Sequence, residues 1–353
     1  MALVEIKNIR MRGVAAGVPT KKVTTASYDA LSAEECDLFI KTTGISERRV
    51  APDHISTSDL CIPPARELLT QLNWTPEEVD VIIMVTQSPD HFIPCSAVIA
   101  QNRLGLRKDI PAFDINLGCS GYVYGLYVLS SLLTGGQLKK GLLLAGDKST
   151  SSTAYTDKST YPLFGDAGSA TALEFSDGAS SLFFQLSSDG SGKDVIMVED
   201  GGSRNGLKED TFEMKEIQPG IVRSKRHLKL DGIEIFNFAL REVAPSLTAL
   251  FSFAQHSIES TDFFVFHQAN KLINESVRKK LKISALEKVP YSLENFGNTS
   301  SASIPLTLVT QISYPLNNSA VNLCLSGFGV GFSWAGCILK TDKISCPPLL
   351  EIV

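Results

Sequence analysis

The sequence predicts an α/β protein made of two similar halves, because the same pattern of buried strands occurs twice. Near-continuous apolar runs rich in β-branched or leucine residues occupy residues 79–86 and 140–146. Runs of this kind are typical of strands that are buried on both faces of a parallel sheet. The pattern returns at residues 261–267 and 320–326. We therefore expect an internal duplication in which each half is an α/β unit.

The elements expected along the chain divide it into a first half, residues 1–176, and a second half, residues 177–353. In the first half we expect strands at 1–20, 79–86, 110–115 and 140–146, helices at 29–41, 57–72, 76–79, 95–104 and 121–133, and a Gly/Ala-rich apolar segment at 164–173. The second half repeats this order with strands at 261–267 and 320–326, a helix at 272–281, a turn and helix at 298–312, and an apolar segment at 327–339. Residues 177–230 are rich in Ser, Gly and charge, and we expect surface loops and part of a tunnel wall there.

Composition and charge narrow the class of protein. The 353 residues are 43% hydrophobic and 20% charged, which is typical of a globular protein, and the net charge of −5 gives no basic field for nucleic acid. No apolar run reaches the roughly 20 residues that span a membrane, and the first residues lack the long apolar core of a signal peptide. We expect a cytoplasmic protein that binds neither nucleic acid nor a membrane.

The cysteines and glycines predict neither a disulfide framework nor a cofactor site. Seven cysteines are scattered along the chain, and their odd number and wide spacing argue against paired bridges. No CxxC pair and no helix with two histidines at metal-binding spacing is present, so no metal is expected. The GxGxG run that begins at Gly327 lacks the βαβ unit and later acidic residue of a dinucleotide site, so we expect no cofactor.

Cys119 is the first candidate for chemistry. It stands between Gly118 and Ser120, where an expected strand ends and an expected helix begins. The free N–H groups and the positive end of the helix dipole at such a turn lower the pKa of a thiol from roughly 8.5 and favour the nucleophilic thiolate. A buried core cysteine would fit the same pattern, because free Cys is among the most buried residue types.

Two further polar residues stand at equivalent places in the second half. His267 ends an expected strand, and Asn298 lies in the turn that corresponds to the Cys119 turn. Ligands of α/β proteins gather at the carboxyl ends of strands. A neutral imidazole and an amide can both donate hydrogen bonds to an oxygen that gains negative charge. A core histidine or a turn asparagine would explain each residue alone, but the three together predict a catalytic site.

Three separated motifs resemble the β-ketoacyl-[acyl carrier protein] synthase III family. They are DINLGCSG at residues 114–121, HQAN at 267–270 and NFGNTSSASIP at 295–305. The segments TGISERR at 43–49, FGDAG at 164–168 and GFGVGFSW at 327–334 extend the resemblance over nearly the whole chain. The resemblance implies a thiolase-like fold, which is a five-layered αβαβα duplication, and a homodimer.

The resemblance also implies a mechanism. Cys119 takes an acyl group from a thioester, and malonyl-[acyl carrier protein] then loses CO₂ to give an enolate that His267 and Asn298 stabilise. The enolate carbon attacks the acyl group, which gives a 3-oxoacyl thioester for fatty-acid-like or secondary-metabolite biosynthesis. The main-chain N–H groups of Cys119 and Val330 are implied as the oxyanion hole.

Four positions depart from the family's pattern for coenzyme A. Where members that use acetyl-CoA carry a Trp and three Arg residues, this chain has Leu38, Thr42, Leu272 and Lys158. Most of these side chains can neither stack on adenine nor pair with phosphate. The resemblance therefore implies that much of the coenzyme A site is lost.

Basic residues are retained where the family docks its acidic carrier protein. Arg278, Lys279 and Lys280 lie on the helix expected at 272–281. Positive charge there would attract an acidic partner and speed its association, although a solvated helix face can have the same composition. We expect an acyl carrier protein and an acyl thioester as the partners.

Three other functions remain open. An acyltransferase without decarboxylation would pass the acyl group from Cys119 to an amine, a hydroxyl or another carbon, although the second donor, Asn298, favours condensation. A papain-type hydrolase would also place Cys before His and Asn, but its local signature and its fold do not match. An inactive subunit of a heterodimeric synthase would have no need to retain Cys119, His267 and Asn298.

Overall fold

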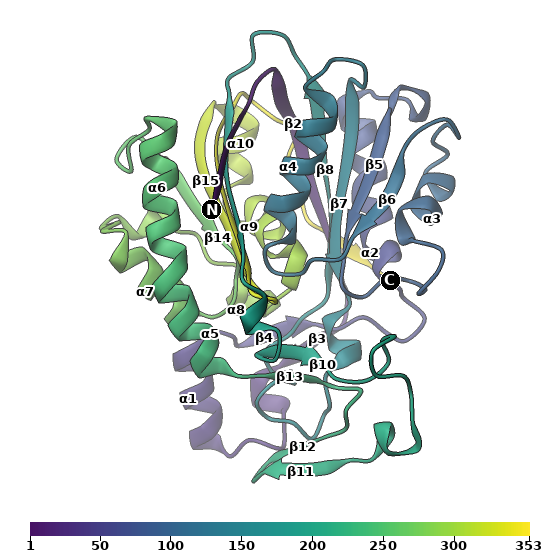
Figure 1. The fold of residues 1–353 in the computed structure, drawn as a ribbon, viewed down its shortest axis with the longest axis vertical. Coiled ribbons are helices and arrows are strands. Elements are labelled where there is room, and N and C mark those ends of the chain that lie inside the picture. Colours follow the sequence, from purple (N-terminus) through teal and green to yellow (C-terminus); the bar gives the residue numbers. More distant parts are fainter.

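The computed structural model describes residues 1–353 and contains two large β-sheets, with helices between them and on their outer faces (Figure 1). The first sheet consists, in spatial order, of β17 (Leu350–Ile352), β2 (Ile9–Pro19), β8 (Ala167–Phe175), β7 (Lys140–Asp147), β5 (Val81–Val85) and β6 (Ala112–Ile115). The second sheet consists of β1 (Ala2–Ile6), β9 (Leu182–Ser188), β16 (Ser333–Thr341), β15 (Val321–Gly329) and β14 (Phe263–Phe266).

The two sheets repeat one topology. In the first sheet β5 is parallel to β7, β7 is antiparallel to β8, and β8 is antiparallel to β2. In the second sheet β14, β15, β16 and β9 follow in the same order with the same relative directions. The internal duplication expected from the sequence is therefore confirmed.

Two helices form the layer between the sheets. Both α4 (Gly121–Leu133) and α9 (Ser303–Gln311) contact strands of both sheets. Apolar side chains of these helices and of the facing strands form the largest buried cluster of the protein. Within it Tyr122 is fully buried, and its hydroxyl lies 2.9 Å from Thr171 Oγ1, which satisfies the one polar atom that the ring brings into the core.

The outer layers complete the five-layered αβαβα arrangement that the sequence predicts. The first sheet is covered by α2 (Thr57–Leu72) and α3 (Ser96–Arg103), which pack through a separate apolar cluster. The second sheet is covered by α5 (Gly232–Phe238), α6 (Ala244–Ala254) and α7 (Lys271–Lys280). None of the helices is long and apolar enough to cross a membrane.

The terminal strands cross between the halves. The single strand expected at residues 1–20 is wrong, because Asn8 adopts φ = +64° and separates β1 from β2. β1 then pairs with β9 of the second sheet, while β17 at the other end of the chain pairs with β2 of the first. The boundary expected at residue 176 stays a prediction, and both terminal strands lie in the sheet of the opposite half.

The expectation of surface loops at residues 177–230 is wrong for β9. This strand lies between β1 and β16, and its Phe184 and Gln185 are almost completely buried. Ser- and Gly-rich segments on both sides obscure its short apolar pattern in the sequence. The rest of the segment includes β10 (Ile196–Val198), β11 (Lys215–Gln218), β12 (Ile221–Arg223) and β13 (Leu228–Leu230).

These short strands gather at one end of the molecule, at the bottom of Figure 1, together with α1 (Ala33–Thr43), β3 (Lys22–Thr24) and β4 (Glu47–Arg49). Ser32 and Glu35 form a capping box at the start of α1, and Gly44 ends the helix with φ = +76°. A four-residue helix, α8 (Leu293–Phe296), and α10 (Ser313–Asn318) complete the fold. The carboxyl ends of β5, β7 and β14 point toward this end of the molecule.

Candidate active site

Cys119 lies in the turn that joins β6 to α4. Asp114 in β6 accepts hydrogen bonds from the main-chain N–H groups of Ser96 and Ala97, both at 2.7 Å, which ties this strand to the start of α3. Gly121 begins α4 directly against β5, since a Cβ added there would lie 2.4 Å from a side-chain carbon of that strand. These contacts hold the turn in place, and Cys119 is buried.

The end of β15 lies against the same turn. A Cβ added at Gly329 would lie 2.9 Å from Cys119 Sγ, and one added at Gly327 would lie 2.7 Å from the Cys119 carbonyl oxygen. Only glycine permits so close an approach. The main-chain N–H of Val330 thereby reaches the thiol as a hydrogen-bond donor. The two halves of the protein meet at this cysteine.

Burial controls the protonation of Cys119. It raises the pKa of the thiol to about 12, and the nearby Asp147 carboxylate adds to the rise. Hydrogen bonds from the main-chain N–H groups of Val330 and Cys119 and from Ser300 oppose it. The lowered pKa that the sequence predicts is therefore wrong for the free protein, because desolvation outweighs the helix end. At neutral pH the resting group is the thiol.

His267 follows β14 and is buried. Its Nδ1 lies 2.7 Å from Ser303 Oγ at the start of α9, and Phe328 meets the imidazole edge-on with 5.8 Å between the ring centroids. Burial lowers the pKa of the imidazole to about 3, so the ring is neutral at physiological pH. With Nδ1 engaged by Ser303, Nε2 is the nitrogen available to a ligand.

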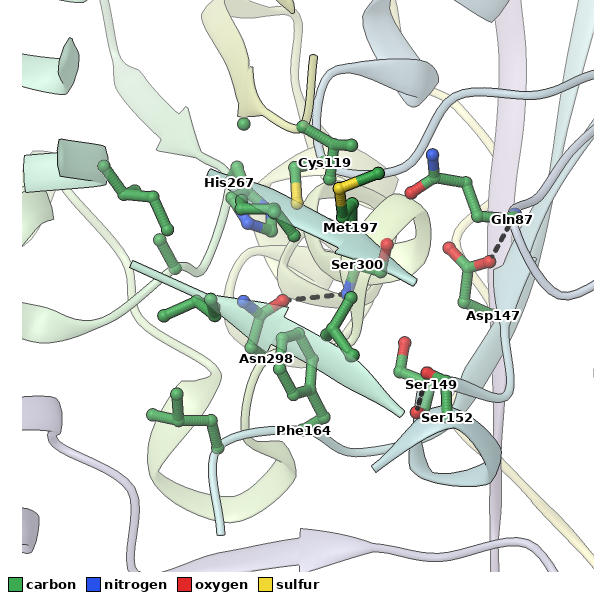
Figure 2. Close-up of a pocket in the computed structure, with 18 of the residues that line it drawn as sticks. Gln87, Cys119, Asp147, Ser149, Ser152, Phe164, Met197, His267, Asn298 and Ser300 are labelled. Carbon is green, nitrogen blue, oxygen red and sulfur yellow. Dashed lines mark hydrogen bonds between the residues drawn. The ribbon is translucent and has the colours of Figure 1, made fainter. Parts of the chain in front are cut away.

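Asn298 lies in the turn between α8 and α9. Its Oδ1 accepts a hydrogen bond from Ser300 N at 2.9 Å (Figure 2). Its main chain bonds to Leu163 and Gly165, at 2.9 and 3.0 Å, and so holds the turn against the first half. Because Oδ1 is already engaged, Nδ2 is the group left to donate into the cavity.

Cys119, His267 and Asn298 line one cavity of about 300 Å³, and Figure 2 shows their side chains grouped around the same space. The larger apolar side chains of its wall are those of Leu163, Phe164, Ile196, Met197, Val198, Leu228, Leu230, Ile235, Ile273 and Phe328. Ile196, Met197 and Val198 belong to β10, and Leu228 and Leu230 belong to β13. The expectation that residues 177–230 supply part of a tunnel wall is therefore confirmed.

Asp147 is a residue of the cavity that sequence reasoning missed. It is 2% exposed, and its carboxylate accepts hydrogen bonds from the main-chain N–H groups of Gln87 and Ser301, at 2.7 and 3.1 Å. The hydroxyls of Thr86, Ser88 and Ser301 donate to it as well. The usable signal was an acidic residue directly after a buried strand. Asp147 thus joins the carboxyl end of the first sheet to the turn that carries Asn298.

The residues expected to dock a carrier protein differ in their accessibility. Arg278 is 9% exposed and pairs with Glu275 at 2.8 Å, so little of its charge faces solvent, and its docking role stays a prediction. Lys279 and Lys280 are exposed at the end of α7, although Lys280 Nζ also donates to the Leu240 carbonyl at 2.6 Å. The docking role of these two lysines stays a prediction.

The positions that depart from the coenzyme A pattern lie on the same side of the protein. Leu38 on α1 and Leu272 on α7 are 64% and 49% exposed, and these two helices contact each other. Lys158 pairs with Glu35 at 2.6 Å. No group of three or more His, Cys, Asp or Glu side chains is arranged to hold a metal ion.

Comparisons with known proteins agree with the fold. The sequence profile described as 3-oxoacyl-[acyl-carrier-protein (ACP)] synthase III matches residues 113–190, and the profile of the C-terminal part of that family matches residues 251–341. A crystal structure of a 3-oxoacyl-(acyl-carrier protein) synthase from Burkholderia xenovorans superimposes with a TM-score of 0.93 and 34% identity, covering 99% of each chain. The fold is therefore that of the thiolase-like condensing enzymes.

Curated relatives identify the family within that class. A β-ketoacyl-[acyl-carrier-protein] synthase III from Mesorhizobium japonicum is 32% identical over 94% of this chain and 98% of its own. A protein of the same name from Staphylococcus haemolyticus is also 32% identical, over 95% of this chain and 100% of its own. The chain belongs to the 3-oxoacyl-[acyl-carrier-protein] synthase III family of condensing acyltransferases.

Proposed function

We propose that the protein loads an acyl group on Cys119 and condenses it with malonyl-[acyl carrier protein], with loss of CO₂, to give a 3-oxoacyl thioester. The observation that carries this proposal is the convergence of a thiol, a neutral imidazole and a free amide N–H from two halves of the chain on one cavity. Membership of the family supports the same reaction, because the relatives are named for it.

In the first step the sulfur of Cys119 attacks the carbonyl carbon of an acyl thioester. The new S–C bond forms, the donor leaves as a thiol, and the proton of Cys119 passes to the departing sulfur. Two main-chain N–H groups, those of Cys119 and Val330, reach the sulfur in the free protein. We propose them as the oxyanion hole, which would hold the negative oxygen of the tetrahedral intermediate.

In the second step the malonyl group loses CO₂. The electron pair of the broken C–C bond passes to the thioester oxygen, which becomes an enolate. His267 Nε2 and Asn298 Nδ2 would donate to that oxygen, and neither group needs to titrate to do so. Because His267 is neutral, it can donate one hydrogen bond to this oxygen without forming an ion pair with the substrate carboxylate. The enolate carbon then attacks the acyl carbon and releases the sulfur of Cys119.

The partners are proposed from surface charge and from family membership. Lys279 and Lys280 would attract an acidic carrier protein, while Leu38, Thr42 and Leu272 offer coenzyme A neither stacking nor phosphate contacts. We also propose a homodimer, since Phe92 and Ile93 are 84% and 87% exposed on one loop, and apolar side chains exposed together favour an interface. Size-exclusion chromatography with light scattering tests the dimer.

The test of the reaction combines two readouts. The protein is mixed with acyl groups carried on acyl carrier protein, and intact mass reports the acyl adduct on Cys119. Labelled malonyl-[acyl carrier protein] is then added, and released CO₂ and the 3-oxoacyl product are measured. Acylation followed by CO₂ release in step with product is expected. Acylation with transfer to an amine or hydroxyl and no CO₂ release would contradict the proposal.

A further inference from the structure

One wall of the cavity carries hydrogen-bonding groups that the proposed chemistry does not use. Gln87, Asn116 and Ser149 line it, and their side chains make no hydrogen bond within the protein; Gln87 and Asn116 are exposed, and Ser149 is half-buried. Figure 2 shows Gln87, Ser149 and Ser152 on the side of the cavity opposite His267 and Asn298. Polar atoms that lack a protein partner are free to pair with a ligand.

Gln87 brings this polarity close to the reacting sulfur. A Cβ added at Gly118 would lie 2.3 Å from Gln87 Oε1 and 3.0 Å from Ser300 Oγ. The amide of Gln87 therefore lies beside the residue that precedes Cys119. Its main-chain N–H is fixed by Asp147 at 2.7 Å, which anchors the residue while the side-chain amide stays available. Gln87 and Cys119 line the same cavity, so an acyl group on Cys119 would share this space with the amide.

Next to the cavity lies a second, larger space of about 810 Å³, here called the second chamber, which is open to the surface beside the exposed Phe92 and Ile93. Gln87, Ser88, Ser152 and Val198 line both spaces. Only 4 of the 19 residues around the second chamber are hydrophobic, and two of these, Phe92 and Ile93, are the exposed residues proposed above for the dimer interface. A long alkyl chain that entered this space within one protomer would therefore lose little contact with water. Apolar burial is the main stabilisation that a plain acyl chain can offer, and this chamber gives little of it.

The charges around the second chamber argue against an anionic substituent. Asp53, Asp90 and Asp200 line it together with Lys148 and Arg226. Lys148 Nζ is already occupied, because it donates to the carbonyl groups of residues 52, 53 and 55 at 2.7, 3.3 and 2.9 Å. Lys148 keeps its positive charge, but the three carboxylates outnumber the two cations, so a substrate carboxylate would meet more negative than positive charge.

We propose that the acyl group taken by this site carries a neutral hydrogen-bonding substituent, such as a hydroxyl, oxo or amide group, near its thioester carbon. Gln87 is the residue that selects it, with Ser149 as a second contact on the same wall. This inference rests on the proposed acylation of Cys119 and names the substrate class of that same site.

The test compares three acyl groups of equal length, namely butanoyl, 3-hydroxybutanoyl and succinyl, each presented as the pantetheine thioester. The rate of adduct formation on Cys119 is followed by intact mass. One additional hydrogen bond in the site corresponds to about a tenfold preference, so 3-hydroxybutanoyl is expected to load about tenfold faster than butanoyl. Succinyl is expected to be the slowest. Equal rates, or faster loading of butanoyl, would overturn the proposal.

Variants assign the preference to the wall. Gln87→Leu keeps a similar volume and removes the amide, so the ratio of the hydroxylated to the plain acyl group is expected to fall to about one. Ser149→Ala tests the second contact and keeps the test available should Gln87→Leu fold poorly. Gln137→Leu, at an exposed glutamine in the loop before β7, is the matched control and should keep the tenfold ratio. A ratio unchanged in both cavity variants would refute the role of this wall.

A binding measurement separates this inference from the proposed function. Calorimetry on Cys119→Ala gives dissociation constants for the same three thioesters without any acylation. If the wild-type protein loads none of them, the proposed function fails, and the ratio of the dissociation constants still decides the substrate class. Tighter binding of the 3-hydroxybutanoyl thioester supports the inference, and equal binding of the plain thioester contradicts it.

Discussion

The carboxyl ends of two equivalent strand pairs, β5–β7 in the first sheet and β14–β15 in the second, carry different side chains on a similar backbone. The last paired residues are Val85 and Ala145 in the first sheet and Phe266 and Ser326 in the second. One residue further along, Thr86 corresponds to His267. Two residues beyond the paired position, Asp147 corresponds to Phe328.

These differences give the first strand end a negative charge and the second a neutral environment. At the first end Asp147 is a buried carboxylate that five hydrogen-bond donors satisfy. At the second end Phe328 replaces that charge and packs edge-on against His267, whose pKa is lowered to about 3 by burial. The duplicated backbone thus carries a hydrogen-bonded carboxylate, Asp147, which we call the polar anchor, at one strand end and a neutral imidazole, His267, at the other. The first end holds the loops in position, and the second supplies a donor to the proposed chemistry.

The nucleophile gives the largest expected effect. Cys119→Ala removes the only thiol in the cavity, so the acyl-enzyme should be lost completely, as measured by intact mass after incubation with an acyl thioester. Cys95→Ala, at the half-buried cysteine before α3, is the control and should load normally. A stable acyl adduct on another cysteine of Cys119→Ala would show that the nucleophile has been assigned to the wrong residue.

The donors of the second half should affect decarboxylation and not loading. Removing one preorganised donor to a developing oxyanion slows a reaction by roughly 10²–10³, so His267→Ala and Asn298→Ala should each release CO₂ from malonyl-[acyl carrier protein] that much more slowly. Both variants should still accept an acyl group on Cys119, because the thiol and its main-chain donors are untouched. Decarboxylation at the wild-type rate in either variant would remove that residue from the mechanism.

The polar anchor of the first half is tested by Asp147→Asn. An amide cannot accept from all of the donors that the carboxylate accepts from, so the free energy of unfolding should fall by about 1–3 kcal/mol, measured by urea denaturation. Loss of the negative charge should also lower the pKa of Cys119, because Asp147 raises it. The pH profile of alkylation of Cys119 would then move to lower pH. Thr86→Val, which removes one donor but keeps the negative charge, should cost less stability and should not move the alkylation profile to lower pH.

The sequence predicts that the chain contains two similar halves with polar residues at the ends of equivalent strands. Both features are local patterns, because each depends on residues that are close together in the chain. The helices expected at 57–72 and 121–133 occur at these bounds. The strands that cross between sheets, β1 and β17, could not be predicted, because pairing partners hundreds of residues apart leave no trace in local periodicity. The burial of β9 was missed for a related reason, since its flanking residues are polar.

The sequence predicted which residues line the site, namely Cys119, His267 and Asn298, but it did not predict the pKa of the Cys119 thiol. A turn before a helix indicates a lowered thiol pKa, but the packing of Gly327 and Gly329 onto Cys119 buries the sulfur and raises it. The anchor Asp147 and the orienting hydroxyl of Ser303 depend on contacts between the halves. Such contacts follow only from the assembled fold.

The neutral imidazole predicts how stability depends on pH. The folded pKa of His267 is about 3, and the unfolded value is roughly 6.5, so between these values only the unfolded chain binds the proton. The free energy of unfolding should therefore fall as the pH drops from about 6.5 toward 3, by up to about 1.4 kcal/mol per pH unit from this group. His267→Gln should remove this slope. Parallel pH profiles for the wild type and the variant would show that burial does not hold the ring neutral.

The smallest expected effect concerns Lys279 and Lys280, which lie at the end of α7, the helix whose first turn reaches the cavity at Ile273. Reversing both charges should slow loading from an acyl carrier protein by about tenfold at low ionic strength, because attraction between exposed charges acts mainly on the rate of association. Added salt should reduce this difference in loading rate between the wild type and the variant.

Loading from acyl-CoA should be slow, and charge reversal should not change its rate, since Leu38 and Leu272 offer the nucleotide no charged contact. Lys340→Glu, at an exposed lysine near the far end of β16, is the matched control. Rapid loading from micromolar acyl-CoA, with no response to the reversed lysines, would mean that other residues hold the nucleotide and that the carrier docks elsewhere.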